Sequence, residues 1–207
     1  MKNLLGIFLL LVSVHLWAGD LEAAREAMKR QDTVTAFSLF QKATETGNPE
    51  AQSALATMYR YGIGTTKDYT QALSWYKKAA AQGHTGAQFQ IGYMYQSGEG
   101  VQQDYTQALS WYKKAAKAGD KSSQYVLGVM YYEGQGVKQD YAQSFSWYKK
   151  AADQGDRTAQ HDLGVMYFKG HGVMQNTTLA KELFGKSCDN GFQEGCKKYA
   201  ILNRQGY

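Results

Sequence analysis

The sequence repeats itself every 36 residues, and this period constrains the fold more than any other feature. Residues 68–80 read DYTQALSWYKKAA, residues 104–116 read the same letters, and residues 140–152 read DYAQSFSWYKKAA. Glycine pairs fall on the same frame, at Gly62/Gly64, Gly98/Gly100, Gly134/Gly136 and Gly170/Gly172. Such a period is typical of a solenoid, in which each unit buries its apolar face against the next.

Each unit is predicted to contain two helices. In the second 36-residue repeat, residues 84–119, apolar residues recur at helical spacing over residues 87–97, which predicts a first helix, helix A. Gly98 is expected to end it, because glycine readily adopts the left-handed conformation. A second helix, helix B, should begin near Asp104, which resembles the first residue of a capping box with Gln107. One proline against 22 glycines suits long helices with glycine stops.

Three glycines lie inside the predicted helix A, at Gly92, Gly128 and Gly164. Glycine costs about 1 kcal/mol against alanine in a helix interior. We therefore expect a neighbouring helix to pack closely at these positions. Ala56 and Ala200 hold the same position in the outer units.

The first residues are predicted to be a secretory signal peptide, residues 1–18. Lys2 is the only charge before Asp20, and an almost wholly apolar run is followed by the small residues Ala18 and Gly19. Cleavage is expected after Ala18, giving a periplasmic or secreted protein. An uncleaved anchor is the alternative, but the run is short for a membrane span. No stable membrane insertion is expected after cleavage.

The bulk composition excludes a disordered chain and gives no case for nucleic-acid binding. Hydrophobic residues make up 43% of the sequence and charged residues 20%. Removing residues 1–18 leaves 22 basic and 18 acidic residues, so the formal charge falls from +5 to +4. A charge this small favours solubility rather than a nucleic-acid partner.

The units resemble Sel1-like repeats, a branch of the tetratricopeptide-like helical solenoids. The resemblance covers Pro49 to Cys196 and implies an all-α, right-handed α-solenoid that serves as an adaptor surface, often in bacterial envelopes or in host contact. It rests on the pattern Ala87-x3-Ile91-Gly92-x2-Tyr95-x2-Gly98-x-Gly100-Val101, then Asp104-x3-Ala108-x2-Trp111-x2-Lys114-Ala115-Ala116-x2-Gly119.

The ends of the chain depart from this pattern, as terminal units of a solenoid do when they cap their neighbours. Residues 19–47 are expected to form a plainer tetratricopeptide-like helix pair, and residues 192–207 a capping helix without a partner helix B. Between them we place four Sel1-like repeats, at residues 48–83, 84–119, 120–155 and 156–191.

Cys188 and Cys196 are the only cysteines. In an oxidising compartment an even pair this close is expected to form a disulfide, which would hold the terminal helix. Two reduced thiols are the alternative. The spacing is also similar to that of cysteine-rich Sel1-like proteins, which carry such a pair in each repeat.

One motif suggests catalysis. Ser74-Trp75-Tyr76-Lys77 fits the Ser-x-x-Lys pattern of serine β-lactamases and penicillin-binding enzymes. It recurs in the next two units, at Ser110–Lys113 and Ser146–Lys149, which favours a structural position, and its companion motifs are absent. Because cysteine-rich relatives are described as β-lactamase-like or penicillin-binding proteins, such an activity is the alternative function. We predict no enzyme and no catalytic residue.

No cofactor or metal site is predicted. His84, His161 and His171 do not have ligand spacing, and the glycine pairs follow no strand that would make a phosphate loop. The paired lysines of helix B, such as Lys113 and Lys114, form a basic stripe that we interpret as a solvated face.

The family's inward-facing helix A positions give three ladders, each with the 36-residue step. These ladder positions are Ser53, Phe89, Tyr125, His161 and Lys197; Thr57, Tyr93, Val129, Val165 and Ile201; and Arg60, Gln96, Tyr132, Phe168 and Arg204. They vary between units while the framework does not, which suggests that they are free to serve another purpose.

The predicted function is therefore binding of a protein or peptide along a concave helix A groove by a monomeric adaptor. Exposed aromatics beside arginines favour such a ligand. The alternative is that the rings pack on each other and bind nothing. A toxin-neutralising immunity protein is a third hypothesis. The groove residues are expected to be Phe89, Tyr93, Gln96, Tyr125, Val129, Tyr132, His161, Val165 and Phe168, with Arg60 and Arg204 at its rim.

Overall fold

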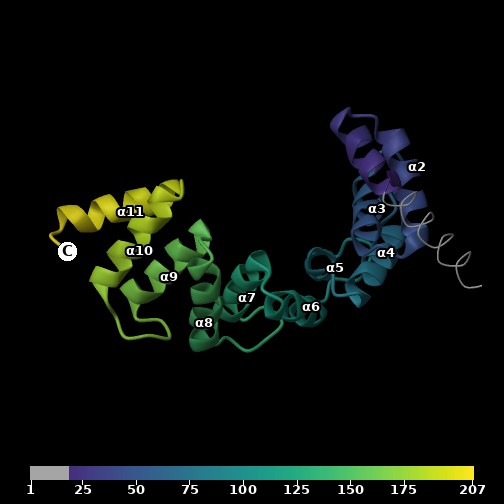
Figure 1. Cartoon of the computed structure of the whole chain (residues 1–207). Coiled ribbons are helices and arrows are strands. Elements are labelled where there is room, and N and C mark those ends of the chain that lie inside the picture. Colours follow the sequence, from purple (N-terminus) through teal and green to yellow (C-terminus); the bar gives the residue numbers. More distant parts are fainter. Residues whose placement is uncertain (1–18) are drawn as a thin grey trace, which may run out of the picture. The chain divides into compact units, whose positions relative to one another are not determined.

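The computed structural model describes residues 19–207, and the predicted signal peptide lies outside these residues. Over the described range the chain is helical with no strand (Figure 1). It divides into two compact units, one up to Gln102 and one from Gln103 onward. The all-helical solenoid expected from the period is confirmed.

The first unit consists of consecutive antiparallel helices. Its core contains Ala27, Phe40, Leu55 and Met58, which are 5% exposed or less. The helices are the helical residues 19–29, α2 (Thr33–Ala43), the 3-10 turn η1 (Thr44–Thr46), α3 (Pro49–Tyr61), α4 (Tyr69–Ala81) and α5 (Thr85–Ser97).

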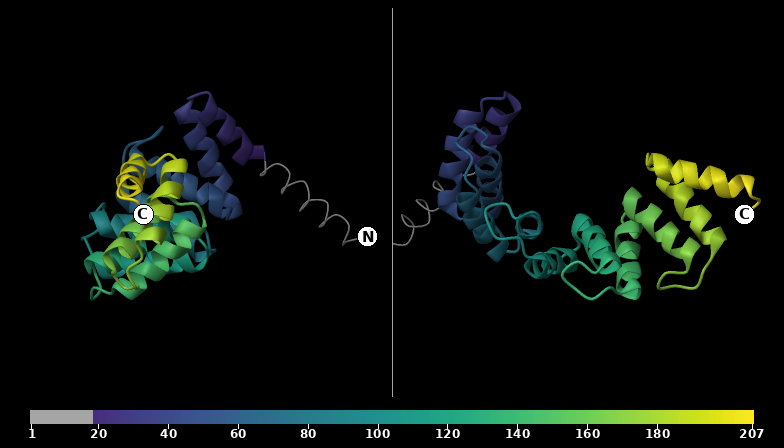
Figure 2. Two further views of the ribbon diagram at one scale, coloured as in Figure 1. Left: turned by 90° about the vertical axis from the view of Figure 1, so that its left-hand side faces the viewer. Right: turned by 180° about the vertical axis from the view of Figure 1, so that it is seen from behind.

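The second unit continues the same alternation. In Figures 1 and 2, α9, α10 and α11 lie side by side, in line with the contacts that α10 makes with both neighbours. Tyr148, Leu163 and Met166 form the centre of one core cluster, and Phe184 and Leu202 close the C-terminal end. The helices are α6 (Tyr105–Lys117), α7 (Lys121–Glu133), α8 (Tyr141–Asp153), α9 (Arg157–Lys169), α10 (Thr177–Asp189) and α11 (Gln193–Arg204).

The helix ends follow the predicted chemistry. The side chain of Asp104 accepts hydrogen bonds from the backbone N–H groups of Thr106 and Gln107, as expected of a helix N-cap. Gly98 ends α5 in the left-handed conformation, with φ 76°. Helix α5 starts two residues earlier than predicted, because Nδ1 of His84 caps it by accepting from the backbone N–H of Ala87 at 3.0 Å.

At Gly128 and Gly164, inside helix A, the neighbouring helix B packs closely, as predicted, and it does so through aromatic rings. A Cβ at Gly128 would overlap the ring of Tyr148, and a Cβ at Gly164 would lie 2.9 Å from Cε1 of Phe184. Glycine therefore lets α7 approach α8, and α9 approach α10, more closely than any other residue would. The packing gained offsets the poor helix propensity of glycine.

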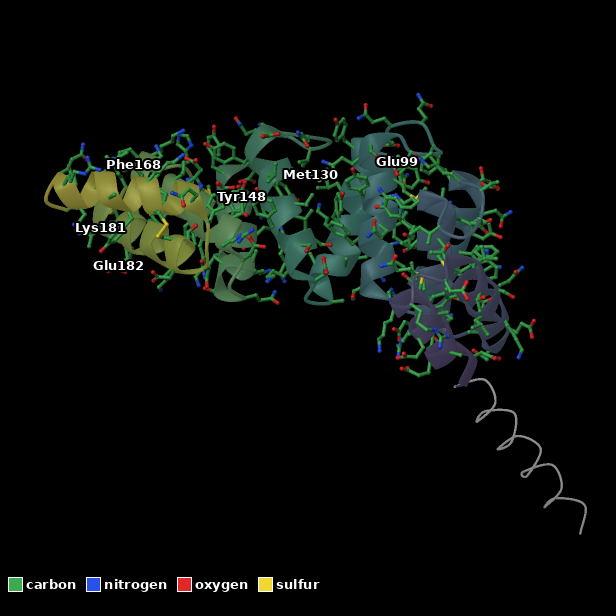
Figure 3. The ribbon with its side chains drawn as sticks, turned by 90° about the horizontal axis from the view of Figure 1, so that it is seen from above. Glu99, Met130, Tyr148, Phe168, Lys181 and Glu182 are labelled. Carbon is green, nitrogen blue, oxygen red and sulfur yellow. A yellow bond between two sulfur atoms is a disulfide. The ribbon has the colours of Figure 1, made fainter. Side chains whose placement is uncertain are left out.

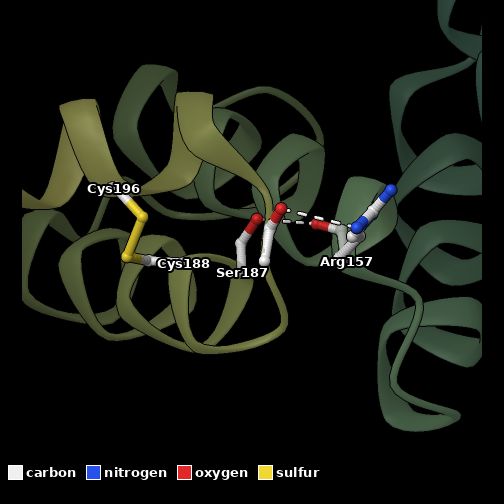
Figure 4. The surroundings of a disulfide bond; sticks show 5 residues. Arg157, Ser187, Cys188 and Cys196 are labelled. Atoms are coloured by element: carbon white, nitrogen blue, oxygen red, sulfur yellow. Dashed lines mark hydrogen bonds between the residues drawn. A yellow bond between two sulfur atoms is a disulfide. The ribbon is translucent and has the colours of Figure 1, made fainter.

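The two cysteines form a disulfide between α10 and α11 (Figure 4). Next to it, the buried hydroxyl of Ser187 donates a 2.7 Å hydrogen bond to the carbonyl oxygen of Arg157, which ties α10 to the start of α9. Gly195 of α11 packs against Ser187, where a Cβ would lie 2.7 Å from Oγ. The disulfide and this close contact therefore add to the packing of Leu202 against Phe184 in holding the terminal helix.

We predict that Gly128→Ala destabilises the protein although alanine is the better helix former. The added methyl group must displace the buried Tyr148 ring, and overpacking of this kind costs about 1–3 kcal/mol. Urea unfolding followed by circular dichroism should show a lower midpoint. Ser122→Ala, at an exposed position of the same helix, is the control and should not lower it. A higher midpoint for Gly128→Ala would contradict the close contact.

Removal of the disulfide should loosen the C-terminal end selectively. For the Cys188→Ser, Cys196→Ser variant, we expect a loss of about 2–3 kcal/mol in the chain-entropy model. Amide hydrogen exchange should accelerate in α11 and remain slow in α7 and α8. A reductant should reproduce this in the parent protein and change nothing in the variant. Unchanged protection of α11 would show that the disulfide does not hold it.

Candidate functional site

In the first unit, the ladder positions centre on a buried arginine. The Arg60 side chain is 4% exposed and its Nε lies 2.7 Å from Oε2 of Glu99. Its Nη1 donates to Oε1 of Gln90 at 2.5 Å. The guanidinium also lies over the rings of Tyr61 and Tyr93, at 5.0 and 4.5 Å from their centroids. Arg60 thus differs from the exposed rim residue expected, because acceptors and rings of its own unit enclose it.

Electrostatics explain why this buried cation is stable. Burial alone would lower the pKa of Arg60, but the hydrogen bond and charge of Glu99 outweigh it and hold the pKa above its ordinary value. Arg60 links α3 to the end of α5, where Glu99 follows the helix (Figure 3). Its neighbours on α5 are less buried: Tyr93 is 40% exposed, and Phe89 and Gln96 are half-buried.

In the second unit, the tyrosine ladder positions line a hollow between α7, α8 and α9. Its volume is about 260 Å³. The hydroxyl of Tyr125 donates to Oδ2 of Asp162 at 3.3 Å, and the hydroxyl of Tyr132 lies 3.0 Å from Nδ1 of His171. The lining residues are Tyr125, Val129, Tyr132, Glu133, Tyr148, Asp162 and Val165.

This hollow is acidic and aromatic. Burial, followed by the negative charge of Asp162, raises the pKa of both Tyr125 and Tyr148, so the phenols stay neutral. His161 lies at the edge, with Nδ1 2.9 Å from Oδ1 of Asp162 and its ring packed against Phe184 and Phe192. The structure therefore brings four predicted groove residues together and adds two carboxylates to them.

A second, smaller hollow adjoins the first, because Val165 lines both. It lies between α9 and α11, has a volume of about 190 Å³, and is largely apolar. Phe168 and Ile201, which line it, are 43% and 47% exposed (Figure 3 labels Phe168). Arg204 is exposed near the end of α11.

Three residues that line the acidic hollow were not predicted from the sequence: Glu133, Tyr148 and Asp162. The contact of His171 with Tyr132 was not predicted either. Glu133 directly follows Tyr132, and Asp162 directly follows His161, so both are sequence neighbours of predicted groove residues. Tyr148 belongs to the repeated Trp-Tyr framework and has a structural position in every unit. A fourth ladder through Gln90 and Asp162 would have found the aspartate.

The Ser-x-x-Lys motifs lie on exposed parts of helix B and do not have the environment of a catalytic pair. Ser146 and Lys149 are both exposed, and Nζ of Lys149 lies 2.7 Å from Oδ2 of Asp153. That hydrogen bond and charge raise the pKa of Lys149, whereas a lysine acting as a general base needs a lowered pKa.

The basic stripe of helix B has a repeated structure of its own. In α4, α6 and α8, a lysine amino group lies over the tryptophan ring one turn earlier, at 3.6–4.1 Å from the ring centroid. The pairs are Trp75/Lys78, Trp111/Lys114 and Trp147/Lys150. These lysines remain exposed, in agreement with the solvated face expected.

Within residues 19–207, no cluster of histidine, cysteine and acidic side chains has an arrangement that would hold a metal ion. In the same range, no helix combines the length and the apolar character that crossing a membrane requires.

We predict that Arg60→Ala destabilises the first unit, because Glu99 and Gln90 lose their partner in a largely buried setting. The expected loss is roughly 1–3 kcal/mol. Arg25→Ala is the matched control, since Arg25 pairs with Glu22 and Glu50 on the surface, where water and salt weaken ion pairs. Urea unfolding should show the larger shift for Arg60→Ala. Equal shifts would mean that Arg60 is not a structural cation.

Comparison with known proteins agrees with the repeat and the fold. The Sel1 repeat model matches residues 25–48, 49–84, 85–120, 121–156 and 158–192. The first of these matches covers the segment that has no Gly-x-Gly loop. A search of curated proteins gave no match.

Among solved structures, a protective antigen of uropathogenic Escherichia coli with an SLR fold is 42% identical with TM-score 0.80. The match covers 82% of this chain but only 36% of the antigen. A Sel1 repeat protein from Oxalobacter formigenes is 29% identical with TM-score 0.83, and the match covers 90% of this chain and 74% of that one. Cysteine rich protein B of Helicobacter pylori shares the fold at 24% identity and TM-score 0.51, covering 63% of this chain and 94% of that one.

Repeats of this kind generally form scaffolds for protein–protein interaction and are typically not enzymes. With five consecutive matches over most of its length, this chain belongs to the Sel1 repeat family.

Proposed function

We propose that this chain is an exported adaptor that binds an extended segment of another protein along the ladder positions of helix A. The observation that carries the proposal is the pair of adjoining hollows on α7, α8, α9 and α11, which are lined by residues that vary between repeats. Hollows with exposed aromatic side chains suit a peptide, because each accepts one side chain while the rings bury its apolar part.

Two further features support export to the periplasm or beyond. The disulfide between Cys188 and Cys196 suits an oxidising compartment. The Escherichia coli relative is described as a protective antigen, which is consistent with exposure to a host. The signal peptide of residues 1–18 remains a prediction, with Gly19 as the expected first residue of the mature chain.

The β-lactamase-like alternative has less support. Its motif is repeated on three helices, and Asp153 engages the lysine of the third copy in an ion pair.

The alternative that the rings of the ladder positions only pack on each other also has less support. Tyr93 and Phe168 retain exposed surface, which favours binding.

Site-specific photo-crosslinking in cells of the source organism tests the proposal. A photoreactive amino acid at Val129 or Phe168 should yield a cross-linked partner, whereas the same group at Ser146, on the exposed face of α8, should not. The Tyr93→Ala, Tyr132→Ala variant should keep its helical circular dichroism and lose the partner. Terminal sequencing of the cross-linked chain should begin at Gly19.

Equal cross-linking at Ser146 and at the ladder positions would overturn the groove. So would retention of the partner by the folded double variant. Either result would mean that the aromatic ladder positions have only a structural role.

A further inference from the structure

The position of the acidic hollow in the second unit has an equivalent in the first unit, where the buried guanidinium of Arg60 lies. Two periods, or 72 residues, separate equivalent positions of the two units. Arg60 is equivalent to Tyr132, Gln90 to Asp162, and Glu99 to His171. The residues around Arg60 therefore show which groups can surround an arginine side chain at this position of the repeat.

In the first unit, the arginine comes from the chain itself. Its guanidinium lies over Tyr61 and Tyr93 and donates to the side-chain oxygens of Gln90 and Glu99. This combination of ring faces and oxygen acceptors is the one that planar guanidinium groups favour.

In the second unit, Tyr132 stands at the position of Arg60, and the groups around it have changed. Val165 replaces the ring of Tyr93, and His171 replaces the carboxylate of Glu99. Asp162 replaces the neutral Gln90, and Glu133 replaces Tyr61, so two carboxylates line the hollow. None of the seven lining residues is basic. The nearby imidazoles are engaged, His161 with Asp162 and His171 with Tyr132.

The tyrosine hydroxyls also differ between the two units. In the first unit, the hydroxyl of Tyr76 lies 2.8 Å from Oγ1 of Thr57. In the second unit, Tyr148 is equivalent to Tyr76 but Val129 is equivalent to Thr57, so this hydrogen bond cannot form. The Tyr148 hydroxyl is thus a further acceptor for an incoming N–H group.

The size of the hollow suits one long side chain. Its volume of about 260 Å³ is at or below the lower end of the range for pockets that take whole small molecules, roughly 300–1,000 Å³. The adjoining hollow at Phe168 and Ile201 is mostly apolar, with Lys169 and Lys198 also among its lining residues, and would take a neighbouring hydrophobic side chain.

We propose that the hollow between α7, α8 and α9 binds an arginine side chain of a partner protein, and that the adjoining hollow binds an apolar side chain close to it in the partner's sequence. The proposal rests on the proposed function, because it names the chemistry of the segment that the ladder positions bind. Arginine is favoured over lysine since its planar group stacks on tyrosine and donates to a carboxylate through two N–H groups.

Nuclear magnetic resonance titration of the mature, disulfide-bonded chain tests the arginine site directly. The probe is the peptide acetyl-Gly-Arg-Gly-Leu-Gly-amide, compared with the same peptide carrying citrulline, a neutral isostere, in place of arginine. We expect amide shifts in α7 and α9 with the arginine peptide, and about tenfold weaker binding of the citrulline peptide, because a charged hydrogen bond is lost. A lysine peptide should bind more weakly than the arginine peptide.

Three variants give the matched comparison. Glu133→Gln with Asp162→Asn should weaken binding of the arginine peptide about tenfold or more. Glu182→Gln with Asp189→Asn removes the same charge from the exposed face of α10 and should leave binding unchanged. Figure 3 places Phe168 and Glu182 toward different edges of this unit. Tyr132→Arg restores the arginine of the first unit and should fill the hollow and abolish binding.

Equal affinity for the arginine, lysine and citrulline peptides would overturn the arginine site. Unchanged binding of the arginine peptide by the folded Glu133→Gln, Asp162→Asn variant, or by the folded Tyr132→Arg variant, would also overturn it. The proposed function is judged separately by photo-crosslinking. If the ladder positions still cross-link a partner in the Glu133→Gln, Asp162→Asn variant, the arginine site fails and the adaptor function stands. If they never cross-link a partner, the adaptor function itself fails.

Discussion

The contact between a glycine of helix A and an aromatic ring of helix B is the constraint on which the helix pairs α7–α8 and α9–α10 depend. Gly128 against Tyr148, and Gly164 against Phe184, let the two helices of a unit approach at a distance that a side chain would prevent. Once that distance is set, the rings are buried at 4% and 2% exposure and the small residues around them have no freedom to vary. Because similar packing recurs from one repeat to the next, the sequence has a 36-residue period.

Each repeat therefore has two kinds of sequence position, those that form the packing and those that vary. Helix B supplies the rings, and in α4, α6 and α8 it also has an exposed Trp–Lys stack and a nearly identical sequence. Helix A supplies the glycine on one face and the ladder positions on another. The ladder positions touch helix B only in part, as Tyr125 does at Tyr148, and they differ from repeat to repeat, from Arg60 in one to Tyr132 in another.

Much of the fold could be predicted because its determinants are local. Asp104 caps its helix, Gly98 ends one, and Cys188 lies eight residues from Cys196, so each feature can be identified within a short stretch of sequence. The candidate site depends on distances between repeats and was only partly predictable. Sequence reasoning identified Tyr125 and Tyr132 as neighbours, but it could not tell that Asp162 would meet them or that Glu99 would bury Arg60.

That difference between Arg60 and Tyr132 indicates how a repeat array acquires a site. A buried arginine needs acceptors and ring faces, and in the first unit the chain provides both, so the position is complete and contributes to stability. In the second unit, the arginine is replaced while acidic acceptors are added at Glu133 and Asp162. Binding at this position therefore requires no new fold, only the replacement of side chains around one position of an existing repeat.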